Sequence, residues 1–147
     1  MRNNRKINLE FVNEVISVDK ENGKTKCVVT FNPHLKEFAD LYGRPSDVIL
    51  SEQPKKCAGL TEALEGGTFT ATGVAACSKD DVYDEERGIE IARQRARFKA
   101  EKKYNRWTFI YAKLMRRTFK SIIKANAHSD DALVRYYEFE KTLKNEL

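Results

Sequence analysis

Positively charged side chains between residues 95 and 124 form the pattern in this sequence that is best suited to binding a ligand. They are spaced by 4, 3, 4, 7, 4, 3 and 4 residues, so on an α-helix they fall along one side. Such a side can neutralise successive phosphates of a nucleic acid without reading its base sequence, or it can bind an acidic protein surface. We call these residues the basic ridge: Arg95, Lys99, Lys102, Arg106, Lys113, Arg117, Lys120 and Lys124.

The charge of the chain is concentrated in the same region. The 147 residues carry a net charge of +5, but residues 84–127 alone hold 13 of the 27 Lys and Arg and 5 of the 22 Asp and Glu. Excess positive charge on one segment is typical of a surface that meets a polyanion or an acidic protein. The alternative is a solvated helix face, since Lys and Arg are good helix formers. The sequence leaves both interpretations open.

Aromatic residues are interleaved with the basic ridge. Tyr104, Trp107 and Phe119 could stack on nucleic-acid bases. However, Trp107 falls in the middle of an apolar stripe about a quarter-turn from the ridge, which favours packing in a core. The stripe consists of Ile89, Ala92, Ala96, Ala100, Trp107, Ile110, Tyr111, Leu114 and Ile122.

A reactive cysteine is the first alternative chemistry to consider. Cys77 precedes a predicted helix start, where a thiol pKa can be lowered. The neighbouring Asp80, Asp81, Asp84 and Glu85 oppose a thiolate, and neither histidine of the chain is linked to Cys77 by a motif. We therefore interpret Cys77 as a buried structural residue, and the three cysteines as neither a disulfide framework nor a zinc site.

Metal and phosphate sites are not indicated either. The acidic residues 80–85 lack the order of a calcium-binding loop, and helix capping explains them more simply. Gly66-Gly67 is not followed by the lysine and hydroxyl residue of a phosphate-binding loop. We expect no catalytic residue, no metal, no cofactor and no enzymatic activity.

The elements that position the ridge begin with a β-hairpin. Asn22-Gly23 is a strong hairpin signal, because both residues tolerate positive φ, and it predicts strands over residues 9–19 and 24–32. A short helix is predicted over 34–42, with Gly43 ending it. The apolar run Val48-Ile49-Leu50 is interpreted as a short strand or a buried loop, and a second short helix is predicted over 55–64.

A third strand and a long helix follow. Residues 68–78 predict a strand whose small side chains, such as Gly73 and Ala75, allow a helix to approach closely. Residues 84–127 predict a helix that Asp81 or Asp84 can cap. At about 1.5 Å per residue it would extend about 66 Å, so it must break near Tyr104-Asn105 or protrude and pair with something. Residues 130–146 predict a closing helix that returns antiparallel, with Leu133, Tyr136, Tyr137, Leu143 and Leu147 for packing.

The junction of the third strand and the long helix carries a recognisable pattern. Its residues are Gly73, Ala75, Cys77, Asp81, Asp84, Gly88, Ala92, Arg95 and Ala96, at the spacing G-x-A-x-C-x3-D-x2-D-x3-G-x3-A-x2-R-A. This pattern resembles a signature of small, functionally unassigned proteins of bacteriophages and bacterial mobile elements. The resemblance implies a mobile-element origin and brings no catalytic residue. It raises the expectation of a protein that binds and disables host machinery, including defence nucleases.

Together these features predict an α+β fold with a small antiparallel sheet packed on helices, a long basic helix and an antiparallel C-terminal helix. We expect a core domain over residues 1–104 and a helical-hairpin extension over 105–147. The absence of a signal peptide or a long apolar run predicts a cytoplasmic protein with no membrane partner. The mobile-element resemblance implies that this cytoplasm is that of a bacterial host cell. We expect it to bind nucleic acid or a host nucleoprotein complex. The alternative is a homo-oligomer assembled through the long helix, with a structural or small-molecule-sequestering role.

Overall fold

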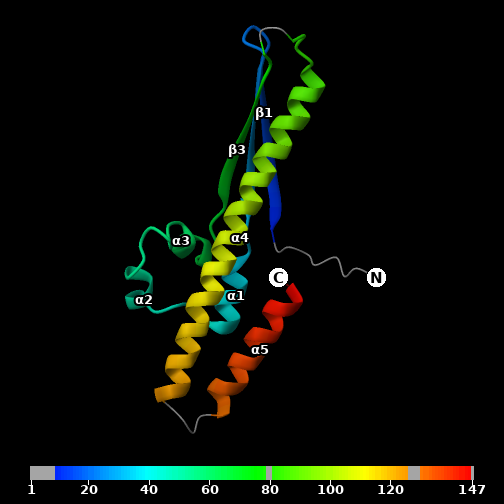
Figure 1. Ribbon diagram of the computed structural model, residues 1–147. Helices are drawn as coiled ribbons and strands as arrows, with labels where there is room; N and C mark the ends of the chain where they lie inside the picture. Colours follow the sequence, from blue (N-terminus) through cyan, green and yellow to red (C-terminus); the bar gives the residue numbers. More distant parts are fainter. Residues whose placement is uncertain (1–8, 79–80, 126–129, 147) are drawn as a thin grey trace. The chain divides into compact units, whose positions relative to one another are not determined.

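A computed structural model describes residues 9–78, 81–125 and 130–146 and has the predicted α+β architecture (Figure 1). Its contacts divide the chain into two units, and helix α4 runs through both. Residues 9–33 and 68–105 form the sheet unit, whereas residues 34–67 and those from 106 onward form the helical unit. The elements are β1 (Glu10–Asp19), β2 (Lys24–Asn32), α1 (Leu35–Tyr42), α2 (Asp47–Ser51), α3 (Leu60–Leu64), β3 (Phe69–Ala76), α4 (Glu85–Ala125) and α5 (Asp130–Glu146).

The sheet unit contains a three-stranded antiparallel sheet in the order β1-β2-β3. The predicted hairpin is confirmed: Gly23 has φ 60°, and the side chain of Asp19 accepts a hydrogen bond from the Asn22 amide at 3.2 Å. The pairing of β1 with β2 shifts between Phe11 and Asn13. The predicted third strand is also confirmed as β3, which pairs with β2 and forms one edge of the sheet.

Helix α4 lies very close to β3 in this unit. A Cβ atom added to Gly73 would be 2.1 Å from the Ala92 carbonyl oxygen and 2.4 Å from the Ala96 nitrogen, so only glycine fits there. Ala92, Ala96 and Ala100 are fully buried. The prediction that small side chains let a helix approach the strand is therefore correct, and the small residues of both β3 and α4 make this close approach possible.

The helical unit is built around Phe139 of α5, which is fully buried. Its ring centroid lies 5.3 Å from those of Tyr42 and Phe119 and 6.1 Å from that of Tyr111. Arg116 of α4 binds the Glu140 carboxylate of α5 through two nitrogens. Phe119 also lies against Tyr136, whereas Tyr111 lies against Phe139, so α5 returns antiparallel along α4, as predicted (Figure 1). Of the residues that the closing helix was predicted to use for packing, Leu143 is buried and Tyr136 is half-buried. Leu133 and Tyr137 are exposed, and Leu147 lies outside the described residues.

Two short segments of the helical unit differ from prediction. The Val48-Ile49-Leu50 run is neither strand nor loop but lies in α2, because the Ser46 hydroxyl caps the helix by accepting a hydrogen bond from the Ile49 amide at 3.3 Å. The helix predicted over 55–64 is limited to α3. Gly59 has φ 80°, a left-handed conformation that interrupts the helix, and residues 54–59 form turns instead.

Helix α4 is continuous, so the break considered near Tyr104-Asn105 does not occur. After Gly88 the helix contains neither glycine nor proline, which are the usual causes of interruption. It begins after Asp84, whose side chain accepts a hydrogen bond from the Arg87 amide at 3.2 Å. Asp81 accepts one from Ser78 instead. Residues 126–127 of the predicted helix lie outside the described residues.

The apolar stripe of α4 is buried except near its ends. Six of its members are at most 6% exposed and Ile110 is 9% exposed, whereas Ile89 is half-buried and Ile122 is 41% exposed. In the part of the chain that the structure describes, no helix combines the length and apolar composition needed to cross a bilayer.

Candidate functional site

All eight residues of the basic ridge are exposed. Arg95, Lys99 and Lys102 belong to the sheet unit, and the other five belong to the helical unit. Within the described residues, none of the ridge lysines has a carboxylate within ion-pair distance: Lys99, Lys102, Lys113, Lys120 and Lys124. The three arginines, in contrast, each make a polar contact within their own unit.

The arginine contacts have structural roles. Arg95 Nη1 donates to the Val74 carbonyl oxygen at 2.7 Å, and Lys103 Nζ donates to that of Thr70 at 3.5 Å. Because β3 is an edge strand, these carbonyls face away from the sheet, and α4 satisfies them. Arg95 therefore helps to hold α4 on the sheet, as well as presenting positive charge.

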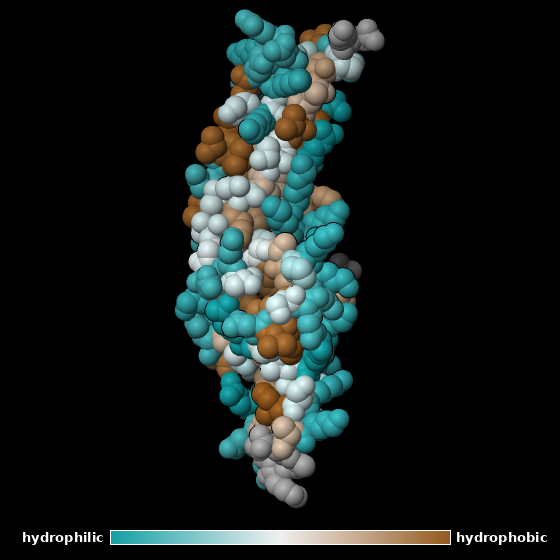
Figure 2. Space-filling model, turned by 90° about the vertical axis from the view of Figure 1, so that its left-hand side faces the viewer, coloured by the Kyte–Doolittle hydropathy of each residue, from teal (hydrophilic) through white to brown (hydrophobic). Residues whose placement is uncertain are grey.

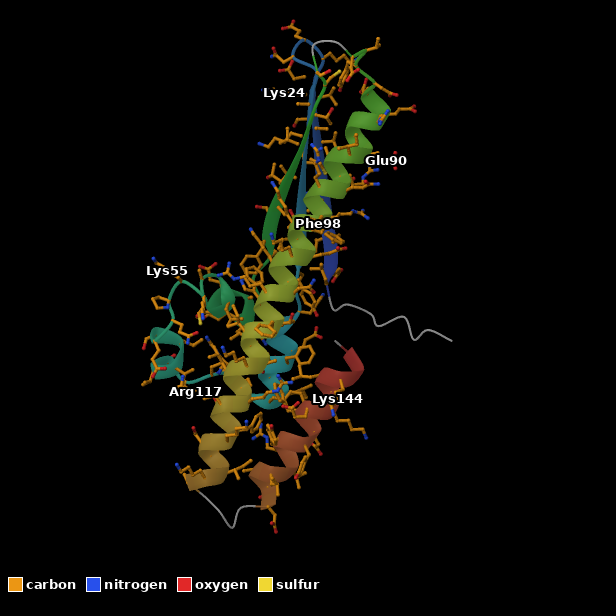
Figure 3. All side chains as sticks on the ribbon, in the orientation of Figure 1. Lys24, Lys55, Glu90, Phe98, Arg117 and Lys144 are labelled. Carbon is orange, nitrogen blue, oxygen red and sulfur yellow. The ribbon has the colours of Figure 1, made fainter. Side chains whose placement is uncertain are left out.

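Arg106 and Arg117 make corresponding contacts in the helical unit. Arg106 Nη2 lies 3.4 Å from the Lys55 carbonyl oxygen. Arg117 donates to the Glu52 carboxylate at 2.8 Å, and Figure 3 shows it pointing from α4 toward the segment that contains α2. Arg117 is thus the one ridge residue whose charge a carboxylate offsets among the described residues.

A shallow groove lies on the ridge side of α4 in the helical unit. Phe109 is 69% exposed there, although the adjacent Ile110 is packed into the core. The remaining lining residues are basic or small and polar, so the groove combines one apolar ring with a dense positive charge. We call it the Phe109 groove, and it is lined by Phe109, Lys113, Arg116, Arg117, Lys120, Ser121 and Lys124.

The charge that this groove offers to a ligand comes from its lysines. Glu140 holds the Arg116 guanidinium and Glu52 holds that of Arg117. The hydrogen bond from Arg116 is also the main reason why the pKa of Glu140 lies below its usual value. The lysines at 113, 120 and 124 keep their ammonium groups in solvent.

A second, more apolar groove occurs in the sheet unit. Phe98 is 65% exposed and is labelled on α4 in Figure 3. It lines the groove together with Val74, Ile91, Gln94, Arg95 and Lys99. On the face drawn in Figure 2, hydrophobic groups form separate small patches between hydrophilic ones, which is the usual character of a protein surface.

The aromatic residues named from the sequence are not free to stack on bases. Tyr104 is 2%, Trp107 6% and Phe119 4% exposed. Trp107 Nε1 donates to the Ala58 carbonyl oxygen at 3.2 Å, which confirms the packing interpretation of this residue.

Phe98 and Phe109 were missed by the sequence analysis, although a signal for them exists. They lie 11 residues apart, about three helical turns, and their helical positions flank the basic ridge on the side away from the apolar stripe.

Cys77 and Cys27 of the sheet unit both lie near oxygen atoms. Cys77 is half-buried rather than buried, because it follows the last residue of β3 and lies outside the sheet. Its Sγ lies 3.4 Å from the Ser78 carbonyl oxygen and 3.3 Å from that of Asp81. Burial raises the pKa of the Cys27 thiol, which lies 3.5 Å from Glu14. Among the described residues, no group of three or more His, Cys, Asp or Glu side chains is placed to hold a metal ion.

A comparison of the chain with protein-family models, with curated proteins and with solved structures finds no match.

Proposed function

We propose that the protein is a non-enzymatic binding protein that docks the basic ridge of α4 on nucleic acid, or on a host complex that handles nucleic acid. The observation that carries this proposal is the absence of negatively charged residues from the second half of α4. Residues 106–125 contain six Lys and Arg and no Asp or Glu. A helix face that serves only to be solvated usually mixes both signs and gains from ion pairs one turn apart.

The contacts within the helical unit favour the same function. The only described carboxylates that reach the cations of this segment are Glu52 and Glu140, and both bind arginines. The lysines at 113, 120 and 124 therefore keep their full charge for a ligand. Phosphates of a nucleic-acid backbone match such a row because each lysine can replace a condensed counterion.

A binding assay with a matched control tests the proposal. The test variant is Lys113→Gln/Lys120→Gln/Lys124→Gln, and the control is Lys26→Gln/Lys56→Gln/Lys141→Gln, which removes the same charge from exposed lysines outside α4. Affinity for labelled DNA and RNA is measured by fluorescence anisotropy. If all three ridge lysines contact phosphates, the test variant loses about 10²-fold in affinity at about 0.1 M salt. Equal losses in both variants, or no binding by the unmodified protein at low salt, would overturn the proposal.

The mobile-element resemblance adds a class of partner to this proposal, namely a host nucleoprotein complex such as a defence nuclease. We expect the protein to capture this complex from a bacterial lysate. Capture is compared with and without nuclease treatment of the lysate. Loss of capture after nuclease treatment assigns the contact to nucleic acid, whereas retained capture that the ridge variant abolishes assigns it to an acidic protein surface.

Homo-oligomerisation through the long helix is the competing proposal. Most of the apolar stripe of α4 is already buried within a single chain, which leaves little of it for a second copy. We therefore place this proposal second. Light scattering decides between them, since a stable dimer at low concentration that binds no nucleic acid supports the oligomer.

A further inference from the structure

We propose that the Phe109 groove binds single-stranded nucleic acid, with an unpaired base stacked on Phe109 and the neighbouring phosphates on Lys113, Lys120 and Lys124. This inference rests on the proposed function and goes beyond it by naming the kind of nucleic acid and the contact that selects it.

The first argument is the position of Phe109. A ring that is 69% exposed leaves apolar surface in water, although the opposite side of α4 is packed in a core that includes the neighbouring Ile110. In the described structure the ring has no aromatic neighbour and projects among lysines and arginines. Exposed aromatic rings beside a positively charged groove are how proteins bind single strands without base preference.

The second argument concerns the form of the nucleic acid. A base can stack on Phe109 only if its face is accessible, and duplex bases are covered on both faces by their neighbours. Extracting a base from a duplex costs a few kcal/mol, whereas a single strand offers its bases at little cost. The phosphate contacts of the lysines are available to both forms, so Phe109 is the residue that distinguishes them.

The third argument excludes an acidic protein as the preferred occupant. Arginine, with its planar fork, is the residue suited to bidentate recognition of carboxylates. In this groove Glu140 and Glu52 already engage Arg116 and Arg117. The lysines that remain act as point charges, which suit the regularly spaced phosphates of a nucleic-acid strand.

Three substitutions at Phe109 test the inference. Phe109→Ala removes the ring, Phe109→Leu keeps an apolar side chain without a π-face, and Phe109→Trp keeps stacking. Tyr137→Ala is the control, because Tyr137 is 63% exposed in the same unit and does not line the groove. Circular dichroism checks that each variant is folded. The probes are a labelled thymidine 20-mer and a labelled duplex of equal length.

We expect Phe109→Ala and Phe109→Leu to weaken single-strand binding on the order of 10-fold and to leave duplex binding within about 2-fold. Phe109→Trp should retain single-strand affinity, and its added tryptophan fluorescence should be quenched by the single strand. Tyr137→Ala should change neither affinity. Equal effects of Phe109→Ala on both probes, or no effect on either, would overturn the inference while leaving the lysine-dependent binding intact. Failure of the unmodified protein to bind either probe would instead overturn the proposed function.

Discussion

Replacing Gly73 by alanine tests how the sheet unit holds α4. The added Cβ would lie 2.1 Å from the Ala92 carbonyl oxygen and 2.4 Å from the Ala96 nitrogen, whereas ordinary contact begins at 3.4 Å. The helix and strand must therefore separate by about 1 Å. Both clashing atoms belong to the backbone, so no change of rotamer relieves them. Overpacking of this kind costs about 1–3 kcal/mol, and we expect about 3 kcal/mol because the displaced helix also loses contacts of its buried alanines.

The assay is urea unfolding followed by circular dichroism, with Thr72→Ala as the control. Thr72 is the residue before Gly73 in β3, and its side chain lies on the opposite face of the strand. We expect a clearly lower unfolding midpoint for Gly73→Ala and a change below about 1 kcal/mol for Thr72→Ala. The close approach would be refuted if Gly73→Ala unfolded within about 0.5 kcal/mol of the unmodified protein.

Two further predictions concern the helical unit. Gly59→Ala should destabilise it by about 2 kcal/mol and shift the fluorescence of Trp107, since a Cβ there would lie 2.8 Å from the indole at φ +80°. A stable variant with unchanged emission would contradict this. The Arg116 guanidinium lowers the pKa of Glu140 below its usual value of 4.5, so this pair stabilises the fold above that pH and the stabilisation is lost as pH falls through the lowered pKa. Glu140→Gln should therefore make the urea midpoint less sensitive to acid. At pH 7 it should lower the free energy of unfolding by about 1 kcal/mol or less, because the pair is partly exposed. An unchanged dependence of the urea midpoint on pH would count against a stabilising pair.

The elements that local chemistry determines were predicted correctly from the sequence. Gly23 specifies the hairpin turn through its positive φ, and Asp84 specifies a helix start through its side-chain oxygen. The close packing of β3 on α4 also follows from residue size, because the small side chains of Gly73 and of the α4 alanines let the two backbones approach closely.

Elements that depend on distant contacts could not be predicted. The left-handed Gly59 packs against Trp107, which is 48 residues away in the chain, and this conformation decides where α3 begins. The error at residues 48–50 has a local cause instead. This apolar run is too short for periodicity to distinguish strand from helix, and the nearby Ser46 hydroxyl, which caps a helix there, was not recognised.

The same distinction applies to the candidate site. Exposure of the basic ridge was predictable, because unpaired charges are costly to bury. The pairing of Arg117 with Glu52 was not predictable, because it depends on the tertiary fold. Phe109 flanks the ridge residues by its helical position alone, so this exposed ring could have been found from the sequence.

The most direct test of the account is the salt dependence of single-strand binding by the unmodified protein and by Lys113→Gln/Lys120→Gln/Lys124→Gln. Each phosphate contact contributes about 0.7 to the slope of log affinity against log salt concentration for a single strand. We predict that the slope for the unmodified protein is steep and that the substitutions reduce its magnitude by about 2. A slope near zero, or one that the three substitutions leave unchanged, would contradict the claim that the ridge binds a phosphate backbone.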